Sequence, residues 1–592
     1  MAASPRSSRK SGATLSTTTQ TIPKISTGEP RLEVEQDKWK ERSVVVGADR
    51  MPLDELRAFY RTGEEIAIAM LPPGTCRVVA RRARGDIFEA QLGNGALFRE
   101  LPSGTFAVEA LAPDGSLLAE ELTTVGTHAG ERPVHGFATS FESESIPAVL
   151  AWLRALRCTV VQIYDWMASY CQPLGPSGGW QDPSGRPVSF EALRTLAAGI
   201  REQGAVAHAY APAYAVDLDF AADHPELLLY RNDGDAQSFF DMIKLANPAN
   251  VTWQRHFVAA YGAAADRIGF DGFHVDTYGY PRAPLDADGC DVDPRAAYAS
   301  FLRFVRASRP RDLISFNQVN GVPSAAELPD GPGFRYCEVW RPNDAWRHLE
   351  ALMDRSAGRA GSLGREVAGG NLIRGTIACY PPVWEVGTGA EQGAAREAAL
   401  RTVVCTEAIA TCLGASALLF GDVTAALSDA YYPKHERLSA AEAATVIAWR
   451  RFALRCRDLF IEGEDTSWYE IGDDNGAVAL VWDGPARPEP IGGALFARVV
   501  RSSECVAVGV VDLSGSPHGL WSEPTARGRC SSVRVRLLLG DPESWSAAAA
   551  VLGRSGDRFA PVPFRVVEHR EGRAVEVELP VDAGWSVLRM TR

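Results

Sequence analysis

Residues Ile268–Gly279 read IGFDGFHVDTYG, a short apolar strand that ends in the carboxylate Asp276 and then turns. A strand that delivers a carboxylate into a loop of aromatic and hydroxyl residues is a common way to present an enzymic nucleophile. A second segment, Phe334–Trp340, reads FRYCEVW and places Glu338 in the same kind of setting. Two acids at separate strand ends suit glycoside hydrolysis, in which one attacks the anomeric carbon and the other protonates the leaving oxygen. The isolated motifs also allow a helix cap or ion-pair role for Asp276 and a solvated acid beside core residues for Glu338.

Short apolar runs alternate with helical stretches across residues 132–464, and this alternation predicts repeated β-α units around a parallel sheet. The strand candidates lie around Gly136–Ser140, Thr159–Tyr164, Ala205–Tyr210, Gly272–Asp276, Asp312–Asn317, Arg335–Val339, Arg374–Cys379 and Ser416–Phe420. Helices with apolar residues at three-to-four spacing are expected at Ile146–Leu156, Phe190–Gln203, Ala249–Arg267, Pro294–Ala307 and Ala394–Leu413. Eight such units predict a closed (β/α)8 TIM barrel with its active site at the carboxyl ends of the strands.

The flanking regions have a different texture. Residues 32–131 alternate polar and apolar positions between turn signals, which predicts a β-sandwich. The alternation returns over residues 465–592 and predicts a second β-domain. Residues 1–31 are rich in Ser, Thr and basic residues, contain no apolar run long enough for a signal-peptide core, and are expected to form a disordered tail.

Composition narrows the class of partner. A net charge of -13 and a pI near 5.4 argue against binding to nucleic acid or to an anionic membrane, because both require clustered Lys and Arg. The 11 Cys form no C-x-x-C pair, so we expect neither a zinc site nor a disulfide framework. No apolar stretch is long enough to span a membrane, and no cofactor fingerprint occurs. We expect a monomer without a cofactor, cytoplasmic by default unless it is exported by a route that the sequence does not reveal.

Asp165 ends the second predicted strand between Tyr164 and Trp166, a setting that suits hydrogen bonds to sugar hydroxyls with aromatic rings stacked on the sugar. The alternative is a structural carboxylate at the rim of the barrel. His274 points to the same side of its strand as Asp276, so it either binds a hydroxyl or is a satisfied interior histidine. Further aromatic and polar candidates at strand ends are Tyr210, Tyr214, Tyr278, Asn317, Asn320, Trp340, Tyr380 and Trp384.

The acidic loop at residues 286–293 has oxygen spacing similar to calcium loops but lacks the terminal Glu at the proper offset. A solvated acidic turn is the simpler interpretation, and no metal is predicted.

Taken together, these motifs resemble glycoside hydrolase family 66, the dextranases and cycloisomaltooligosaccharide glucanotransferases. The resemblance is densest at Gln162–Trp166, Ala207–Tyr210, Leu245–Pro248, Gly269–Gly279, Phe316–Gly321, Tyr336–Trp340 and Leu419–Asp422. It implies an immunoglobulin-like N-terminal domain, a catalytic (β/α)8 barrel and a C-terminal Greek-key domain. It also implies retaining cleavage of α-1,6-linked glucan, with Asp276 as nucleophile, Glu338 as acid/base and Asp165 as a substrate-binding acid.

Three functions remain open at this point. The first is a retaining endo-dextranase. By the resemblance, a glucanotransferase would carry a carbohydrate-binding module inserted in its barrel, and residues 132–457 leave no room for one, which favours the dextranase. A glucanotransferase would use a sugar hydroxyl in place of water, and a non-catalytic glucan-binding protein would not need both acids. The missing export signal differs from the pattern expected of secreted dextranases, so another α-glucan is also a candidate substrate.

Overall fold

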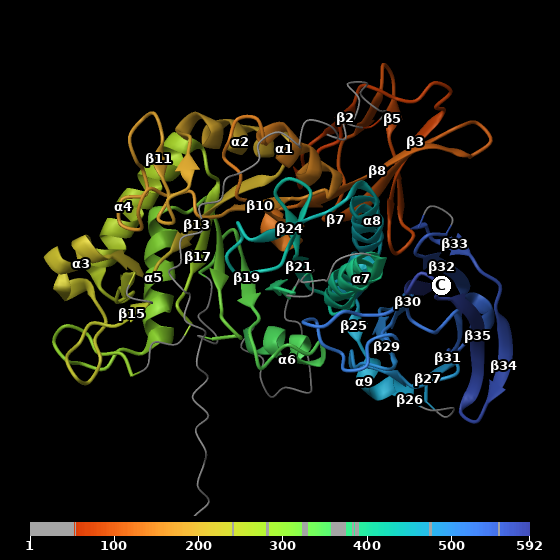
Figure 1. Ribbon diagram of the computed structural model, residues 1–592. Helices are drawn as coiled ribbons and strands as arrows, with labels where there is room; N and C mark the ends of the chain where they lie inside the picture. Colours follow the sequence, from red (N-terminus) through yellow and green to blue (C-terminus); the bar gives the residue numbers. More distant parts are fainter. Residues whose placement is uncertain are drawn as a thin grey trace, which may run out of the picture. The chain divides into compact units, whose positions relative to one another are not determined.

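The computed structural model describes residues 53, 55–239, 242–279, 283–322, 329–356, 374–381, 384, 390–472, 476–554 and 557–592, all in one compact unit (Figure 1). The tail predicted for residues 1–31 lies outside the described residues. No helix in the described ranges is both long and apolar enough to cross a membrane.

A curled sheet of parallel strands lies at the centre of the described chain, and successive strands along the sequence are neighbours in it. Its strands are β9 (His135–Ala138), β10 (Val160–Ile163), β13 (Val206–Pro212), β17 (Gly272–Asp276), β18 (Leu313–Asn317), β19 (Gly333–Glu338), β20 (Thr376–Ala378) and β21 (Ser416–Leu418). Each overlaps one of the eight predicted strands. The chain then continues into β22 (Phe420–Gly421), which pairs in parallel with β9, so the last part of the sheet lies against the first.

Helices connect the parallel strands, and five of them overlap the predicted helices (Figure 1). These five are α1 (Ile146–Ala155), α2 (Phe190–Glu202), α4 (Val251–Ile268), α5 (Pro294–Ser308) and α7 (Ala390–Cys412). Two further helices were not predicted from the sequence: α6 (Arg347–Ser356), between β19 and β20, and α8 (Ala440–Glu462), which follows the last strand of the sheet. Shorter pieces are α3 (Leu218–Asp223), α9 (Ser467–Glu470), β11 (Trp180–Gln181), β12 (Pro187–Val188), β14 (Ala215–Asp217), β15 (Ser238–Phe239), β16 (Ile243–Leu245), β23 (Ala425–Leu427) and β24 (His435–Arg437).

Two glycines explain how the segment Ile268–Gly279 folds. Gly269 ends α4 with φ of 94°, a left-handed conformation that costs glycine little and that turns the chain toward β17. Gly272 opens β17 so close to the next strand that a Cβ would lie 1.9 Å from the carbonyl oxygen of Leu313. The strand can therefore pair tightly with β18 and deliver Asp276 at its end.

Asp422 joins the two ends of the curled sheet. Its buried carboxylate accepts hydrogen bonds from the backbone N–H of Thr139 (2.8 Å) and the hydroxyl of Ser140 (2.7 Å), which follow β9. It also accepts from the N–H of Val423 (2.7 Å). These bonds hold the segment after β22 against the first strand of the sheet.

Separate β-sheets precede and follow this central region. The N-terminal five-stranded sheet contains β1 (Phe59–Arg61), β8 (Leu117–Gly126), β7 (Gly104–Leu111), β3 (Arg77–Arg82) and β4 (Ile87–Glu89), and a three-stranded sheet contains β2 (Ile66–Ile68), β6 (Ala96–Phe98) and β5 (Gln91–Leu92). One apolar core cluster draws residues from both sheets.

The C-terminal part has the same two-sheet construction, with a shared valine-rich core. One sheet contains β25 (Glu464–Asp465), β28 (Ala486–Arg487), β29 (Leu495–Arg501), β30 (Cys505–Asp512), β36 (Trp585–Thr591), β32 (Ser546–Val551) and β33 (Ala560–Pro561). The other contains β26 (Ile471–Gly472), β27 (Val478–Val481), β31 (Ser532–Leu538), β35 (Gly572–Pro580) and β34 (Arg565–His569).

Candidate functional site

Three neighbouring strands each end in a polar side chain: β17 in Asp276, β18 in Asn317 and β19 in Glu338. Because the strands are parallel, these ends meet at one edge of the sheet. The Nδ2 of Asn317 donates to Oδ1 of Asp276 at 2.7 Å and to Oε2 of Glu338 at 3.0 Å. The backbone N–H of Glu338 in turn donates to Oδ1 of Asn317 at 3.3 Å. One amide side chain therefore binds both carboxyl groups.

A tyrosine hydroxyl binds each carboxyl group from the other side. Tyr210, on β13, donates to Oδ2 of Asp276 at 2.8 Å, and Tyr380, after β20, donates to Oε1 of Glu338 at 2.6 Å. Burial, and then the neighbouring carboxylate charge, raises the pKa of both phenols well above the usual value. The pKa of Tyr214 is raised in the same way, by burial first and then by Asp276. The phenols therefore remain protonated hydrogen-bond donors.

The environment of Asp276 disfavours its ionised form. Only 9% of the residue is exposed, and burial followed by the charge of Glu338 raises the pKa of Asp276 to about 7. Hydrogen bonds from Asn317, Tyr210 and the backbone N–H of Thr277 act in the opposite direction. The raised pKa thus reflects two acids that share one enclosed site.

Asp165 is a second buried carboxyl group at the same edge of the sheet. Burial raises the pKa of Asp165 to about 7. The charge of Arg186 opposes this rise, and the charges of Asp182 and then Asp276 add to it. The adjacent Tyr164 lies between two aromatic rings, 4.5 Å from Tyr210 and 4.2 Å from Tyr432 between centroids. Electrostatic coupling and ring contacts therefore link Asp165 and Tyr164 to the Asp276 side of the site.

Trp166 does not lie in the cleft. It is fully buried, packs against Tyr261 and Phe270, and donates from Nε1 to the backbone oxygen of Tyr210 at 3.0 Å. Its face is therefore not free to stack on a sugar, in contrast to the expectation from the sequence. The reason is local: Asp165 has a left-handed φ of 49°, so the alternation of the strand stops before Trp166.

His274 is an interior residue beneath the carboxyl groups. It is 2% exposed, and its Nδ1 lies 2.8 Å from the hydroxyl of Ser315. Burial lowers the pKa of His274 well below the usual value, so the imidazole is neutral. Of the two roles that the sequence allowed, the position favours the satisfied interior histidine.

The remaining candidates line the outer part of the site or lie farther from it. Trp340 is 44% exposed with its ring centroid 5.8 Å from that of Tyr380, and its backbone N–H donates to the side chain of Asn320 at 2.8 Å. Tyr278 packs against Tyr214, at 6.1 Å between centroids. Trp384 is buried under a guanidinium group and carries no contact to either acid among the described residues.

The sequence matches the family model of glycosyl hydrolase family 66 over residues 120–588. The chain belongs to this family. The family predicted from the motifs is confirmed, and the family is one of glycoside hydrolases.

The chain spans less than a third of the length of the two curated relatives that it matches. A cycloisomaltooligosaccharide glucanotransferase from Niallia circulans is 24% identical over 292 residues, which cover 44% of this chain and 30% of the relative. A dextranase from Streptococcus salivarius is 25% identical over 215 residues, 31% of this chain and 25% of the relative. The crystal structure of a cycloisomaltooligosaccharide glucanotransferase from Paenibacillus sp. with cycloisomaltoheptaose has a TM-score of 0.73 at 16% identity, covering 90% of this chain and 98% of that one. That likeness concerns the fold.

Sequence reasoning missed Tyr432 of this family 66 protein. Tyr432 follows β23 rather than one of the eight predicted strands, yet its hydroxyl lies 2.7 Å from that of Tyr336 and its ring stacks on Tyr164. Its centroid is 6.2 Å from that of Tyr380. The sequence signal was the pair Tyr431-Tyr432, but nothing in the pattern connected it to the strand ends.

The acidic loop of the family 66 chain is held by its own backbone. Oδ1 of Asp286 accepts from the N–H groups of Asp288 and Cys290 at 3.0 and 2.8 Å, and Asp293 caps α5 by accepting from the N–H of Arg295. Within the described ranges, no group of three or more His, Cys, Asp or Glu side chains is arranged to hold a metal ion.

Proposed function

We propose that this family 66 chain is a retaining glycoside hydrolase that cleaves α-1,6-glucosidic linkages within dextran-like glucan. The observation that carries the proposal is the single Asn317 nitrogen bound to both Asp276 and Glu338. The two acceptor oxygens cannot be farther apart than the sum of 2.7 and 3.0 Å. This close approach of one oxygen from each acid is compatible with the ~5–5.5 Å separation of the carboxyl groups in retaining glycosidases.

The two acids would act in sequence. Asp276 attacks the anomeric carbon and forms a covalent glucosyl ester while Glu338 transfers its proton to the departing glycosidic oxygen. Glu338 then accepts a proton from water, whose oxygen attacks the anomeric carbon, breaks its bond to Asp276 and frees that carboxylate. The pair gives up its one proton to the leaving oxygen in the first step and regains one from water in the second. Asn317 and Tyr210 stabilise the charge on Asp276 before attack, and Tyr380 orients Glu338 through its 2.6 Å bond.

The buried carboxyl of Asp165 would bind sugar hydroxyls beside the reacting centre, with Tyr164 close to it. The half-exposed Trp340 offers a ring face on the Glu338 side of the site, where a neighbouring glucose unit could stack. The side-chain oxygen of Asn320 accepts a hydrogen bond from the backbone N–H of Trp340 and so holds the backbone of Trp340 in place. With Asp165 and Tyr164 on one side of the acids and Trp340 on the other, the site suits a chain of glucose units that passes across both acids.

We also infer that the curled sheet is a closed (β/α)8 barrel over residues 132–464, with an immunoglobulin-like sandwich over residues 32–131 and a Greek-key domain over residues 465–592. Support comes from the parallel order of β9 to β21, from the pairing of β22 with β9, and from the TM-score of 0.73 to the Paenibacillus structure. We expect a monomer, which light scattering on the purified chain would test.

The test is to incubate the protein with dextran and to follow reducing ends and products by chromatography. We expect isomaltooligosaccharides from wild type, loss of hydrolysis in Asp276→Ala and Glu338→Gln, and retained activity in the control Asp288→Asn, which changes an exposed loop acid. In Asp276→Ala, azide should restore cleavage and give a β-glucosyl azide, because a single displacement inverts the α centre. Full turnover in Asp276→Ala without azide contradicts the proposal.

A second candidate function is transfer to a sugar hydroxyl in place of water. The similarity to two cycloisomaltooligosaccharide glucanotransferases favours it, although one match covers 30% of the relative and the other concerns the fold. Cyclic or lengthened products from dextran would identify the transferase, whereas linear oligosaccharides with a matching rise in reducing ends would identify the hydrolase.

A further inference from the structure

A cavity of about 390 Å³ lies outside the candidate active site. Its lining residues come from the N-terminal five-stranded sheet, from α8 and from the segment leading into β33, elements whose ribbons Figure 1 shows. This volume is within the range of roughly 300–1,000 Å³ that small-molecule sites occupy. Its polar lining comes from all three parts: Arg81, Arg82, Thr105 and Glu109 from the sheet, Arg455 from α8 and Arg558 from the C-terminal segment.

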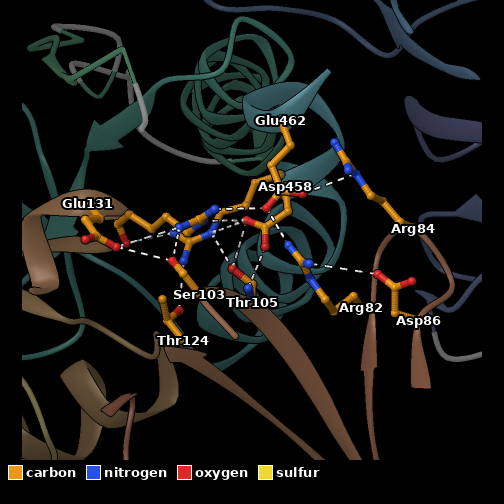
Figure 2. A network of polar contacts seen from close by, with 11 residues as sticks. Arg82, Arg84, Asp86, Ser103, Thr105, Thr124, Glu131, Asp458 and Glu462 are labelled. Carbon is orange, nitrogen blue, oxygen red and sulfur yellow. Dashed lines mark hydrogen bonds and ion pairs between the residues drawn. The ribbon is translucent and has the colours of Figure 1, made fainter. Parts of the chain in front are cut away.

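One wall of the cavity is held rigidly by buried ion pairs (Figure 2). Arg82 pairs with Glu462 at the end of α8, and Asp458, one turn earlier, accepts from the backbone N–H of Thr105 at 2.5 Å. Arg132 donates to both acids, at 3.2 Å to Asp458 and 2.9 Å to Glu462. The wall therefore keeps its shape without a ligand, and the Nε of Arg82 has no hydrogen-bond partner among the described residues.

Four arginines contribute to the lining although the protein carries a net charge of -13. Four guanidinium groups face one carboxylate, Glu109, which pairs with Arg81 at 3.1 Å. Arg455 is 8% exposed and gives its two terminal nitrogens to Glu120, while its Nε is buried without a partner in the described chain. Arg558 has no ion pair to any residue that the structure describes. Arg81, Arg82 and Arg455 thus have acid partners, which leaves the guanidinium of Arg558 to pair with a ligand.

We propose that this cavity binds a small oxyanion, a molecule with a carboxylate or phosphate group. Planar guanidinium groups match the geometry of both anions and bind them with paired N–H donors. One face of Phe559, an aromatic residue of the lining, is covered by the guanidinium of Arg589 at 4.7 Å, which leaves less aromatic surface for a neutral sugar. The proposal does not depend on the catalytic function.

Calorimetric titration of the full chain at constant ionic strength tests the proposal, with inorganic phosphate and citrate as the two probes and chloride as the blank. We expect saturable binding of at least one probe and at least a tenfold weaker affinity in Arg558→Gln. The control Arg570→Gln removes an exposed arginine of the same C-terminal region that lies outside the cavity lining, and it should bind like wild type. The preferred probe distinguishes the phosphate from the carboxylate source.

A second measurement keeps the result independent of calorimetric sensitivity. A ligand that binds only the folded chain raises the unfolding temperature in proportion to the logarithm of its concentration, once that is well above Kd. We expect this rise with the bound probe in wild type and Arg570→Gln, and a smaller one in Arg558→Gln. Absence of saturable binding and of any shift beyond the chloride blank overturns the proposal, as does binding that Arg558→Gln leaves unchanged.

Discussion

At the scale of single residues, Asn317 is the side chain on which the two acids depend. Its amide donates to both carboxyl groups, so Asn317→Ala removes a hydrogen bond from each. We expect kcat on dextran to fall about 10²–10³-fold, the range for removal of one preorganised donor. The unfolding temperature of Asn317→Ala should change little. Asn317→Asp has the same shape, but its kcat should also fall because it adds a third carboxyl group beside the two acids. A kcat within threefold of wild type in Asn317→Ala contradicts this role.

The electrostatic interaction between Asp276 and Glu338 predicts how hydrolysis depends on pH. Because the charge of Glu338 helps to raise the pKa of Asp276 to about 7, loss of the last proton from the pair occurs near that pH. Two anions then remain with no acid to protonate the leaving oxygen, so kcat/KM for dextran should fall as the pH rises through about 7. Glu338→Gln removes this charge and should retain alkaline activity on an isomaltosyl fluoride, whose leaving group needs no acid. Dextran hydrolysis that still rises between pH 7 and 9 contradicts the prediction.

The sequence predicted residues whose position follows from a strand end, and missed those that depend on backbone turns. Asp276, Asn317 and Glu338 end adjacent parallel strands, so period and order along the chain were enough to bring them together. Trp166 was expected to stack on a sugar but is buried, since the left-handed backbone at Asp165 redirects it. Tyr432 reaches the site from a later loop, a long-range contact that local pattern cannot reveal.

At the scale of elements, the eight strands and five helices were predictable because apolar spacing reports which face of each element is buried. The three short antiparallel strands β22, β23 and β24 were not predictable, since strands of two or three residues carry too little pattern. Yet β22 is the element that pairs with β9, and Asp422 directly after it binds the residues that follow β9.

Asp422→Ala tests that connection. The variant removes the acceptor of the buried Thr139 and of the partly buried Ser140, which should lower the free energy of unfolding by roughly 2–4 kcal/mol. Burial opposes ionisation of Asp422, but the charge of His435 and these hydrogen bonds outweigh it and lower its pKa. The stabilisation is therefore present near neutral pH and lost in acid, so the deficit of the variant should shrink below about pH 4. Denaturant unfolding at several pH values measures the loss of stability. Asp114→Ala, which changes an exposed turn residue, is the control. An equal loss of unfolding free energy in the two variants contradicts the prediction.

At the scale of the whole molecule, buried ion pairs connect the N-terminal sheets to the last helix of the central region. Asp458 on α8 is 1% exposed and accepts from Thr105 on β7 and from Arg132 before β9, and Arg457 donates to the hydroxyl of Thr105 at 2.9 Å. Figure 2 shows Asp458 and Thr105 meeting between the sheet and α8. The composition could not predict this network, because each charge looks like a surface residue until its partner some 300 positions away is known.

Asp458→Asn tests whether this network binds the two regions into one unfolding unit. Loss of the carboxylate leaves the buried guanidinium of Arg132 with less compensating charge, and breaking such a pair typically costs about 3–5 kcal/mol. The control Asp266→Asn breaks an exposed pair with Arg309, worth roughly 1 kcal/mol or less. Calorimetry should show a lower unfolding temperature for Asp458→Asn and a second, earlier transition from the N-terminal sheets, with kcat on dextran unchanged at 25 °C. The opposite outcome is a single transition whose temperature falls no more than that of Asp266→Asn. Apolar packing alone would then hold these regions together, since the attraction within the ion pairs would only offset their desolvation cost.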